Sequence, residues 1–361
     1  MKRSLLEYLR NVRKLISFGG VYIAHKIPRF LRGAKLQNGT FEKEVDVVYL
    51  WKDDSDEDWL RKEVKDLAGV DDDAYYINQK QFYSDDLRLT LDDLRYSMRS
   101  VEKHFKSLRR VFIVTDGQRP RWLNPDCKDV TIVDVADIIT DPEYLPSYNS
   151  QAIESHLYNI EGLTEEFIYL NDDFYMCSAH HASDFFLPDG SIYVRLGRGL
   201  SAKGEPTNCE DADTSAHKNS NAVLDTRFRE ESRLTVMHRP YALSQTLMRE
   251  CLRQFPEEFH QTRKSRFRSI KMYALHNCLI PYACHYEGKA QLISPSVFEK
   301  DMYVWTNDLT ANAEHASELL NKEHEGFCIQ EERGLRLSRE AVEQYHELMH
   351  ALYPEKSRFE L

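Results

Sequence analysis

The stretch FIYLNDDFYM, residues 167–176, decides the fold expected for this chain. Its apolar, β-branched and aromatic residues predict a buried strand that ends at Asn171, Asp172 and Asp173. Ligands of open α/β sheets bind at the carboxyl ends of the strands. Because two adjacent carboxylates repel each other, a divalent cation or a bound proton is needed to relieve the pair. The alternative is a strand followed by an Asp-rich turn.

Three further β-rich stretches precede this strand along the chain. They are EVDVVYLW at 44–51, RVFIVTDG at 110–117 and DVTIVDV at 129–135. Apolar residues at helical spacing predict a helix within 88–106, and Asn149 or Ser150 can cap another over 151–159. Because strands separated by helices pair in parallel, we expect an α/β fold with a Rossmann-like three-layer core. No GxGxxG fingerprint and no Walker phosphate loop follows any of these strands.

The remaining chain suggests a loop and then a helical part. Residues 196–222 are rich in Gly, Ser, Asn and Asp, which favours a mobile loop or lid. Helical patterns follow at 240–254, 265–287 and 338–353, the last capped by Ser338 and stopped by Pro354. We therefore divide the chain into an arm and one domain with three parts. These are an arm over 1–40 and a domain over 41–361, made of an α/β core (41–195), the loop (196–222) and a helix-rich part that completes the site (223–361).

Charge is distributed unevenly along the chain. Residues 1–35 carry nine basic residues and one acid, although the whole chain has a net charge of −11. The acidic remainder argues against nucleic acid as a partner. The apolar residues of the arm fall on one helical face, so it is either a membrane-surface helix or a helix docked on its own domain. No run reaches the length of a membrane span or resembles a cleaved signal, so we expect a cytoplasmic protein with peripheral contact to the inner membrane face.

Seven cysteines are scattered without a CxxC pair. Their odd number and spacing favour reduced thiols over a disulfide framework or a zinc site. His180 and His181 are adjacent, and neighbouring residues seldom bind one ion, so we expect loop histidines there.

Four separated blocks resemble the conserved regions of the Stealth family of sugar-1-phosphate transferases. The blocks are VDVVYLWKDDSDEDW (45–59), the long stretch from Asp92 to Asp173, MHRPYAL with FPEEFHQTRKSRFRS (237–243 and 255–269), and FCIQEE with YPEKSRFE (327–332 and 353–360). The resemblance implies transfer of hexose-1-phosphate or N-acetylhexosamine-1-phosphate from a UDP-sugar to a glycan hydroxyl. The product would be a phosphodiester and the leaving group UMP, in capsule or cell-surface polysaccharide synthesis.

The resemblance also implies roles for individual residues. His238 matches a position linked to catalysis and suits a general base, and Arg268 suits binding of the transferring phosphoryl group. Asp53 would be a metal ligand or would accept the proton of the acceptor hydroxyl. Mg²⁺ or Mn²⁺ would be bound by Asp172, with a catalytic role as well, and by Asp173 and Glu331. The expected substrate-binding residues are Asn171, Arg95, Gln118, Glu154 and Arg266.

Two positions depart from the family pattern. Asp54 stands where family members usually have Gly, and Gln330-Glu331 stands where they have Asn-Asp. Two other functions stay open at this point. One is a metal-dependent glycosyltransferase that releases UDP, and the other is a non-catalytic module that binds polysaccharide.

Overall fold

The computed structural model describes residues 40–53, 55–68, 91–294, 302–332 and 335–361. The chain divides between Gly39 and Thr40 into two units, and all described residues belong to the second. The basic arm over 1–35, with its expected membrane contact, lies outside the described residues, as does Asp54. Among the described helices, none combines the length and the apolar character that crossing a membrane requires.

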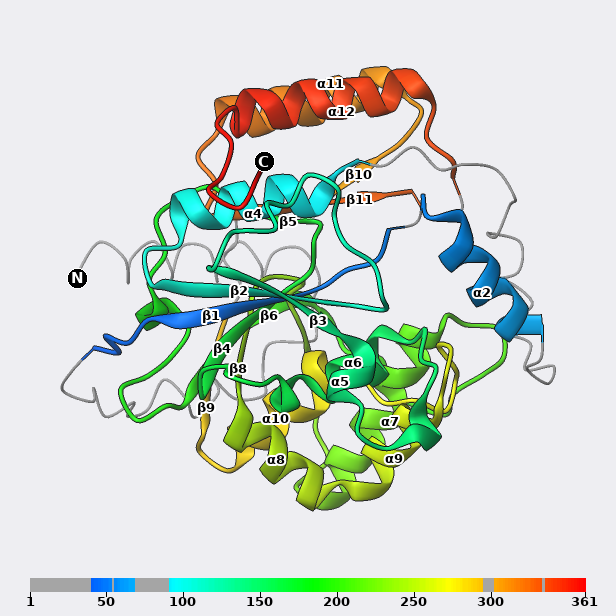
Figure 1. Cartoon of the computed structure of the whole chain (residues 1–361). Coiled ribbons are helices and arrows are strands. Elements are labelled where there is room, and N and C mark those ends of the chain that lie inside the picture. The colour runs from blue at the N-terminus through cyan, green and yellow to red at the C-terminus, as the bar shows by residue number, and fades with distance from the viewer. Residues whose placement is uncertain (1–39, 54, 69–90, 295–301, 333–334) are drawn as a thin grey trace, which may run out of the picture. The chain divides into compact units, whose positions relative to one another are not determined.

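A five-stranded sheet forms the centre of the described unit (Figure 1). In spatial order its strands are β3 (Val130–Asp134), β2 (Leu108–Thr115), β1 (Val45–Leu50), β4 (Glu166–Leu170) and β8 (Tyr241–Ser244). The first four are parallel, and β8 runs antiparallel to β4. All five residues of β4 are buried, as a run of aromatic and β-branched side chains covered on both faces requires.

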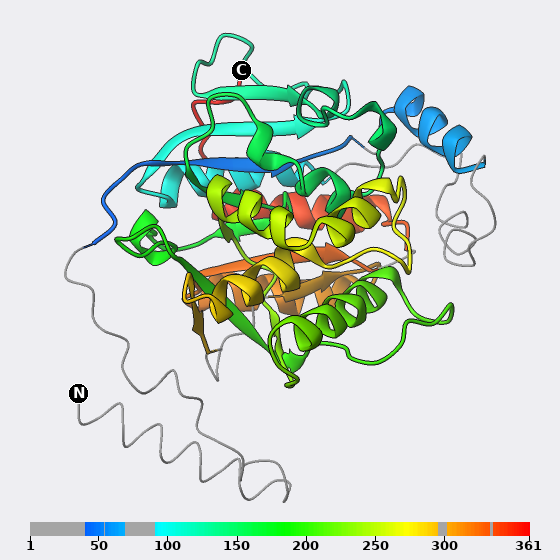
Figure 2. The same cartoon turned by 90° about the horizontal axis from the view of Figure 1, so that it is seen from below.

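Helices cover both faces of this sheet. Figure 1 shows α4 (Asp93–His104) on one face, and Figure 2 shows α8 (Gln245–Gln254), α9 (Pro256–Lys264) and α10 (Ile280–Tyr286) on the other. The other α-helices of the described residues are α2 (Glu57–Ala68), α5 (Val135–Ile138), α6 (Ser150–Glu154), α7 (Ala212–Arg227), α11 (Leu309–Asn321) and α12 (Arg339–Leu352). The predicted α/β fold with a three-layer, mostly parallel core is confirmed.

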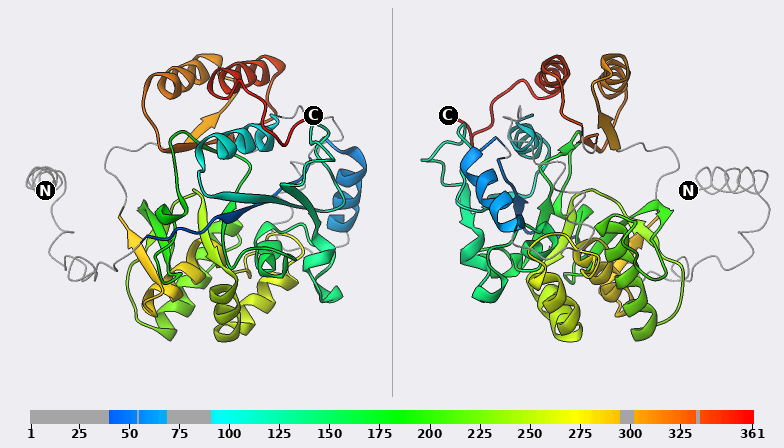
Figure 3. Two further views of the ribbon diagram at one scale, coloured as in Figure 1. Left: turned by 60° about the vertical axis from the view of Figure 1, so that its left-hand side comes forward. Right: turned by 90° about the vertical axis from the view of Figure 1, so that its right-hand side faces the viewer.

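Two three-stranded sheets flank the central one. The first has the order β10 (Met302–Trp305), β11 (Gly326–Glu331) and β5 (Phe174–Met176). Helices α11 and α12 lie side by side over it, as Figure 3 shows. The other has the order β7 (Leu234–Val236), β6 (Ile192–Leu200) and β9 (Ala290–Ile293). Short 3₁₀ turns lie at Pro142–Tyr144, Leu157–Asn159 and Ala182–Asp184, and a π-helical turn at Leu275–Leu279 leads into α10.

Residues 196–222 are not a structureless loop. The stretch contains the end of β6 and most of α7, whose first turn is capped by Asp211 through a 2.9 Å hydrogen bond from Thr214 N. Its polar residues are buried because they pair: Asn221 Nδ2 donates to Ser201 Oγ at 2.8 Å, and the buried Arg233 donates to Asn221 Oδ1 at 3.0 Å. The low apolar content therefore reflects a hydrogen-bonded interior, and motion of this segment stays a prediction.

The expected helices are present with different bounds. Residues 240–254 begin with β8, because Tyr241–Ser244 pair with β4 before α8 starts. Residues 265–287 become helical only at Leu275, and α9, which starts at Pro256, was not expected. The helix predicted over 151–159 is divided into α6, capped by Asn149, and a 3₁₀ turn. The Ser338 cap of α12 is confirmed, with its Oγ 3.1 Å from Ala341 N.

Candidate functional site

The strand order reverses between β1 and β4, whose carboxyl ends lie at one edge of the sheet (the crevice edge). Strands β2 and β3 follow β1 on one side, whereas β4 lies on the other, so the order reverses between β1 and β4. Ligands of open α/β sheets bind at such a reversal, outside the carboxyl ends of the strands. Asp53 follows β1 and Asn171 follows β4 at this edge. The topology alone therefore selects the Asn171–Asp173 connection as the place for a ligand.

All three sheets contribute residues around Asp173. The Asn171–Asp173 connection joins β4 of the central sheet to β5 of the second sheet. Strand β11 pairs with β5 so that Cys328 lies opposite Phe174, and Ile329 N donates to Asp173 O at 3.1 Å. His238 lies between β7 of the third sheet and β8, which returns beside β4. Backbone pairing thus holds these segments, far apart in sequence, at one point.

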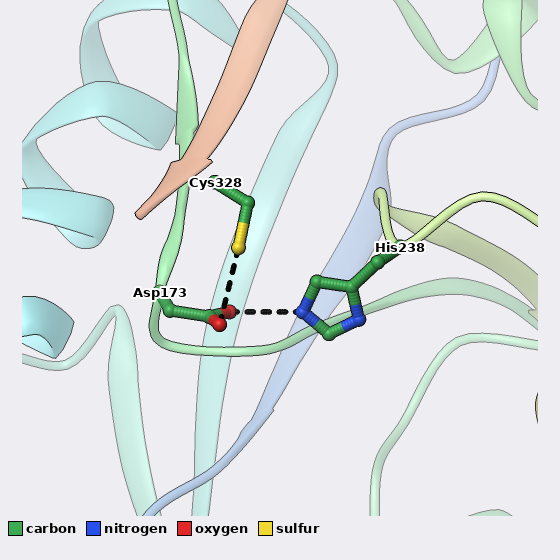
Figure 4. Close-up of side chains that lie close together, drawn as sticks. All are labelled: Asp173, His238 and Cys328. Carbon is green, nitrogen blue, oxygen red and sulfur yellow. Dashed lines mark hydrogen bonds and ion pairs between the residues drawn. The ribbon is translucent and has the colours of Figure 1, made fainter. Parts of the chain in front are cut away.

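The Asp173 carboxylate is the centre of this cluster. His238 Nε2 lies 3.1 Å from Asp173 Oδ1, and the Cys328 thiol donates to Oδ2 at 3.1 Å (Figure 4). The Gln330 side-chain amide also donates to Oδ2, at 3.2 Å. Within the described ranges, Asp173, His238 and Cys328 are the group of metal-ligating side chains whose donor atoms all lie within 4.8 Å of one another.

The charges in this cluster favour an ion pair. Burial raises the pKa of Asp173, but the hydrogen bonds from His238, Cys328 and Gln330 outweigh it and lower the pKa overall. For His238, burial lowers the pKa, while the hydrogen bond and charge of Asp173 raise it above the ordinary value. Glu154 raises the pKa of His238 further, so this carboxylate also lies within electrostatic reach. Each partner of this contact therefore stabilises the charged form of the other.

Asn171 also faces the imidazole. Its Nδ2 lies 3.3 Å from His238 Nε2, the same nitrogen that faces Asp173. An amide nitrogen is a donor, so it binds Nε2 only when that nitrogen carries no proton, whereas Asp173 needs the proton there. Asn171 Oδ1 is buried and has no hydrogen-bond partner among the described residues. His238 can therefore satisfy only one of its two neighbours at a time.

The three carboxylates predicted as metal ligands are not gathered into one cluster. Only Asp173 belongs to a group compact enough for one ion among the residues that the structure describes. Asp172 is its sequence neighbour, and the exposed Glu331 ends β11. Adjacent carboxylates such as Asp172 and Asp173 fit Mg²⁺ or Mn²⁺ when substrate phosphates supply other ligands, which is how Mg²⁺ is usually bound.

Asp53 and Gln118 are joined at the ends of β1 and β2. The Gln118 amide accepts from Asp53 N at 2.8 Å and donates to Asp53 O at 3.1 Å, so it holds the two strand ends together. The Asp53 carboxylate accepts from Ser55 N and Oγ, at 2.9 and 2.5 Å. Asp92, the residue before α4, has its pKa raised by burial and further by Asp53. Asp53 thus lies within electrostatic range of a second carboxylate.

Arg95 and Arg266, both expected to bind substrate, also make contacts within the protein. Arg95 Nε donates to Glu360 at 2.7 Å, and Arg99 donates to both oxygens of the same carboxylate, each at 2.7 Å. The closing segment of the chain is thereby held on α4. Arg266 is exposed, and its backbone carbonyl accepts from Tyr148 N at 2.7 Å.

Glu154 and Arg268 form a second polar group beside α6. Glu154 is buried, accepts a 2.8 Å hydrogen bond from Tyr169 and forms an ion pair with His276. Burial raises the pKa of Glu154, but His276 and Tyr169 outweigh it and lower the pKa overall. Arg268 contributes to the same lowering and donates to Ser150 Oγ at 3.0 Å.

Two residues of these clusters were missed from the sequence. Cys328 could have been found, because side chains at i and i+2 share one face of a strand and Gln330 stands out in the same block. His276 had no such signal, since its contact with Glu154 depends on how the segment before α10 packs against α6. His180 Nε2 donates to Glu325 O at 3.0 Å, in agreement with a loop histidine.

Comparisons with known proteins identify the family. Residues 88–194 match Stealth protein CR2, conserved region 2, and residues 237–276 match Stealth protein CR3, conserved region 3. The chain is 32% identical to a capsular polysaccharide phosphotransferase of Haemophilus influenzae over 79% of this chain and 77% of that protein. It is 29% identical to a capsular polysaccharide phosphotransferase of Actinobacillus pleuropneumoniae over 81% of this chain and 78% of that one.

Longer relatives match as well. An exopolysaccharide phosphotransferase of Streptomyces coelicolor is 35% identical over 68% of this chain and 41% of that protein. The chain therefore spans less than half the length of this relative. On the match to the H. influenzae protein over most of both sequences, together with the two conserved regions, the chain belongs to the Stealth protein family.

Proposed function

We propose that this chain transfers a hexose-1-phosphate or N-acetylhexosamine-1-phosphate from a UDP-sugar to a hydroxyl of a glycan acceptor. The reaction would form a phosphodiester and release UMP in capsule or exopolysaccharide synthesis. The observation that carries the proposal is the contact of Asp173 with His238 at the crevice edge. The names of the relatives, capsular and exopolysaccharide phosphotransferases, support the reaction class.

In the proposed step, the acceptor oxygen attacks the β-phosphorus of the donor. The bond from that phosphorus to the oxygen bridging the two phosphates breaks, and UMP leaves. His238 takes the proton of the acceptor hydroxyl, while Asp173 fixes the imidazole and stabilises the imidazolium that forms. Because Asp173 Oδ1 faces His238 Nε2, the nitrogen that would take the proton of the acceptor is Nδ1.

Arg268 is the proposed partner of the transferring phosphoryl group. A guanidinium stays charged and binds phosphate oxygens bidentately. Arg268 is half-buried and makes one side-chain hydrogen bond, to Ser150, so further N–H groups can be directed at a substrate. When bound, Mg²⁺ or Mn²⁺ on Asp172 and Asp173 would neutralise diphosphate charge. Glu331 stays a proposed ligand of the same ion, and Asp53 stays a proposed ligand or acceptor of the hydroxyl proton. Asn171, Arg95, Gln118, Glu154 and Arg266 stay proposed substrate-binding residues.

The basic segment 1–35 is proposed as a peripheral contact with the inner face of the cytoplasmic membrane. The segment has nine basic residues and one acidic residue, and its cations would be attracted to anionic lipids, each cation near the surface contributing on the order of 1 kcal/mol.

The test is the identity of the released nucleotide. The purified chain is incubated with Mg²⁺ or Mn²⁺, a panel of UDP-sugars and a capsule-fragment acceptor, and the products are separated by chromatography. UMP that disappears with EDTA and in His238→Ala, but persists in the exposed α12 variant His350→Ala, supports the proposal. UDP in place of UMP would show glycosyl transfer. A chain that binds glycan but releases neither nucleotide would be a binding module.

A further inference from the structure

The Asp173 cluster contains a sulfur donor that phosphoryl transfer does not use. Cys328 is fully buried in β11, and its thiol donates to Asp173. Hard cations such as Mg²⁺ prefer oxygen ligands, whereas thiolate and imidazole select softer ions such as Zn²⁺. A set of one carboxylate, one imidazole and one thiol is therefore chemically unlike the magnesium ligands of the proposed reaction.

The spacing of the donor atoms suits a tetrahedral ion. Zinc binds nitrogen and oxygen at about 2.0–2.2 Å and sulfur at about 2.3 Å, which places neighbouring donors ~3.3–3.7 Å apart. Here Asp173 Oδ1 lies 3.1 Å from His238 Nε2, Asp173 Oδ2 lies 3.1 Å from Cys328 Sγ, and no pair of donors exceeds 4.8 Å. Small side-chain rotations would bring all three around one ion.

The cluster is also accessible and firmly supported. The side chains of His238 and Asp173 are 24% and 20% exposed, so an ion from solvent can reach them, while Cys328 closes the inner side. Cys328 cannot withdraw, because β11 is paired on both sides, with β5 and β10. Three protein ligands leave the fourth tetrahedral position open for water or a phosphate oxygen.

We infer that Asp173, His238 and Cys328 form a binding site for a thiophilic divalent cation, Zn²⁺ in the first place. On binding, the ion replaces the thiol proton of Cys328 and the proton that His238 Nε2 shares with Asp173, and both protons leave to solvent. Since Asp173 and His238 are also the proposed reacting pair, a bound Zn²⁺ would block phosphoryl transfer even in excess Mg²⁺. The binding itself does not depend on the proposed function.

Cobalt provides the test, because a thiolate bound to Co²⁺ gives a charge-transfer band and a tetrahedral site gives intense visible bands. The full chain is treated with EDTA, dialysed and titrated with Co²⁺, and then Zn²⁺ is added in competition while heat is measured. We expect one ion per chain, a thiolate band and displacement by Zn²⁺. Cys328→Ser should lose the band and weaken Zn²⁺ binding by at least about 100-fold. Changing a residue that only supports a metal ligand weakens metal binding by up to about 100-fold, and loss of a ligand should cost at least as much.

Matched variants separate the loss of a ligand from the loss of the fold. The exposed Cys209→Ser should keep both the band and the affinity. His238→Gln should lose the tetrahedral visible bands while its circular dichroism stays that of the folded chain. The inference is overturned if the wild-type chain shows no thiolate band, or if Cys328→Ser binds like the wild type. Failure of UMP release with intact cobalt binding would refute the proposed function alone.

Discussion

Asp93 should make the protein less stable as the pH rises from 5 to 8. It accepts hydrogen bonds from Tyr175 of β5 and Tyr345 of α12. The pKa of Asp93 is raised to about 7, chiefly by burial. The hydrogen bonds from the two tyrosines lower this pKa, and the nearby charges of Asp173 and Glu331 raise it. An unfolded Asp has a pKa near 3.9, so between these values the folded state binds more protons and stability falls with rising pH.

The size of the effect follows from the two pKa values. Each pH unit in the window costs about 1.4 kcal/mol, so from pH 5 to pH 8 the penalty is between about 2 and 3 kcal/mol. This loss of stability is essentially complete above pH 7, and it is absent below pH 4. Asp93→Asn keeps an acceptor for the tyrosines but cannot ionise, so it should lack this fall.

Urea unfolding at pH 5, 6, 7 and 8 measures the difference. The histidines act in the opposite direction, since burial lowers the pKa of His104 to about 4 and of His156 to about 3. The comparison with Asp93→Asn cancels those contributions, and Asp126→Asn on an exposed turn is the control. Parallel stability curves for the wild type and Asp93→Asn would refute the reasoning.

Two further predictions concern the packing around the site. Glu360→Gln should lower the free energy of unfolding by about 3 kcal/mol, because it leaves the buried Arg99 without its charged partner, and urea unfolding should show no comparable loss in the exposed Glu340→Gln. Gly326→Ala should cost about 1–3 kcal/mol, because its Cβ would lie 2.6 Å from a ring atom and 2.8 Å from a backbone oxygen of β5. Gly199→Ala, whose Cβ would meet nothing closer than 3.7 Å, should unfold at nearly the wild-type urea concentration.

Local patterns predicted the central sheet well. The stretch FIYLNDD became β4 with its acidic end at the crevice edge, because a buried run of aromatic and β-branched residues has few alternatives to a strand. The expectation of a loop over 196–222 failed for a physical reason. Asn221 and Ser201 in this polar segment are buried and hydrogen-bonded to each other, which composition does not reveal. Tyr241–Ser244 continued a helical pattern but pair with β4, a tertiary contact that outweighs local preference.

The candidate site was only partly predictable. Asp173 and His238 were both singled out, but nothing in their spacing indicated that they touch, because the contact needs three sheets to meet. Glu154 was expected to contact substrate, which stays a prediction, but its buried contacts with His276 and Tyr169 were not foreseen. Long-range pairings of this kind depend on the strand order, which single-sequence patterns do not fix.

The most direct test of the central claim is a double-mutant cycle on Asp173 and His238, measured as UMP release. If the two residues act as one unit, Asp173→Asn and His238→Ala should each lower kcat/KM by about 10²–10⁴-fold. The double variant should then be only slightly slower than the worse single variant. Losses that multiply in the double variant would show that the two residues act independently. Single variants that retain wild-type kcat/KM would place the reaction elsewhere in the protein.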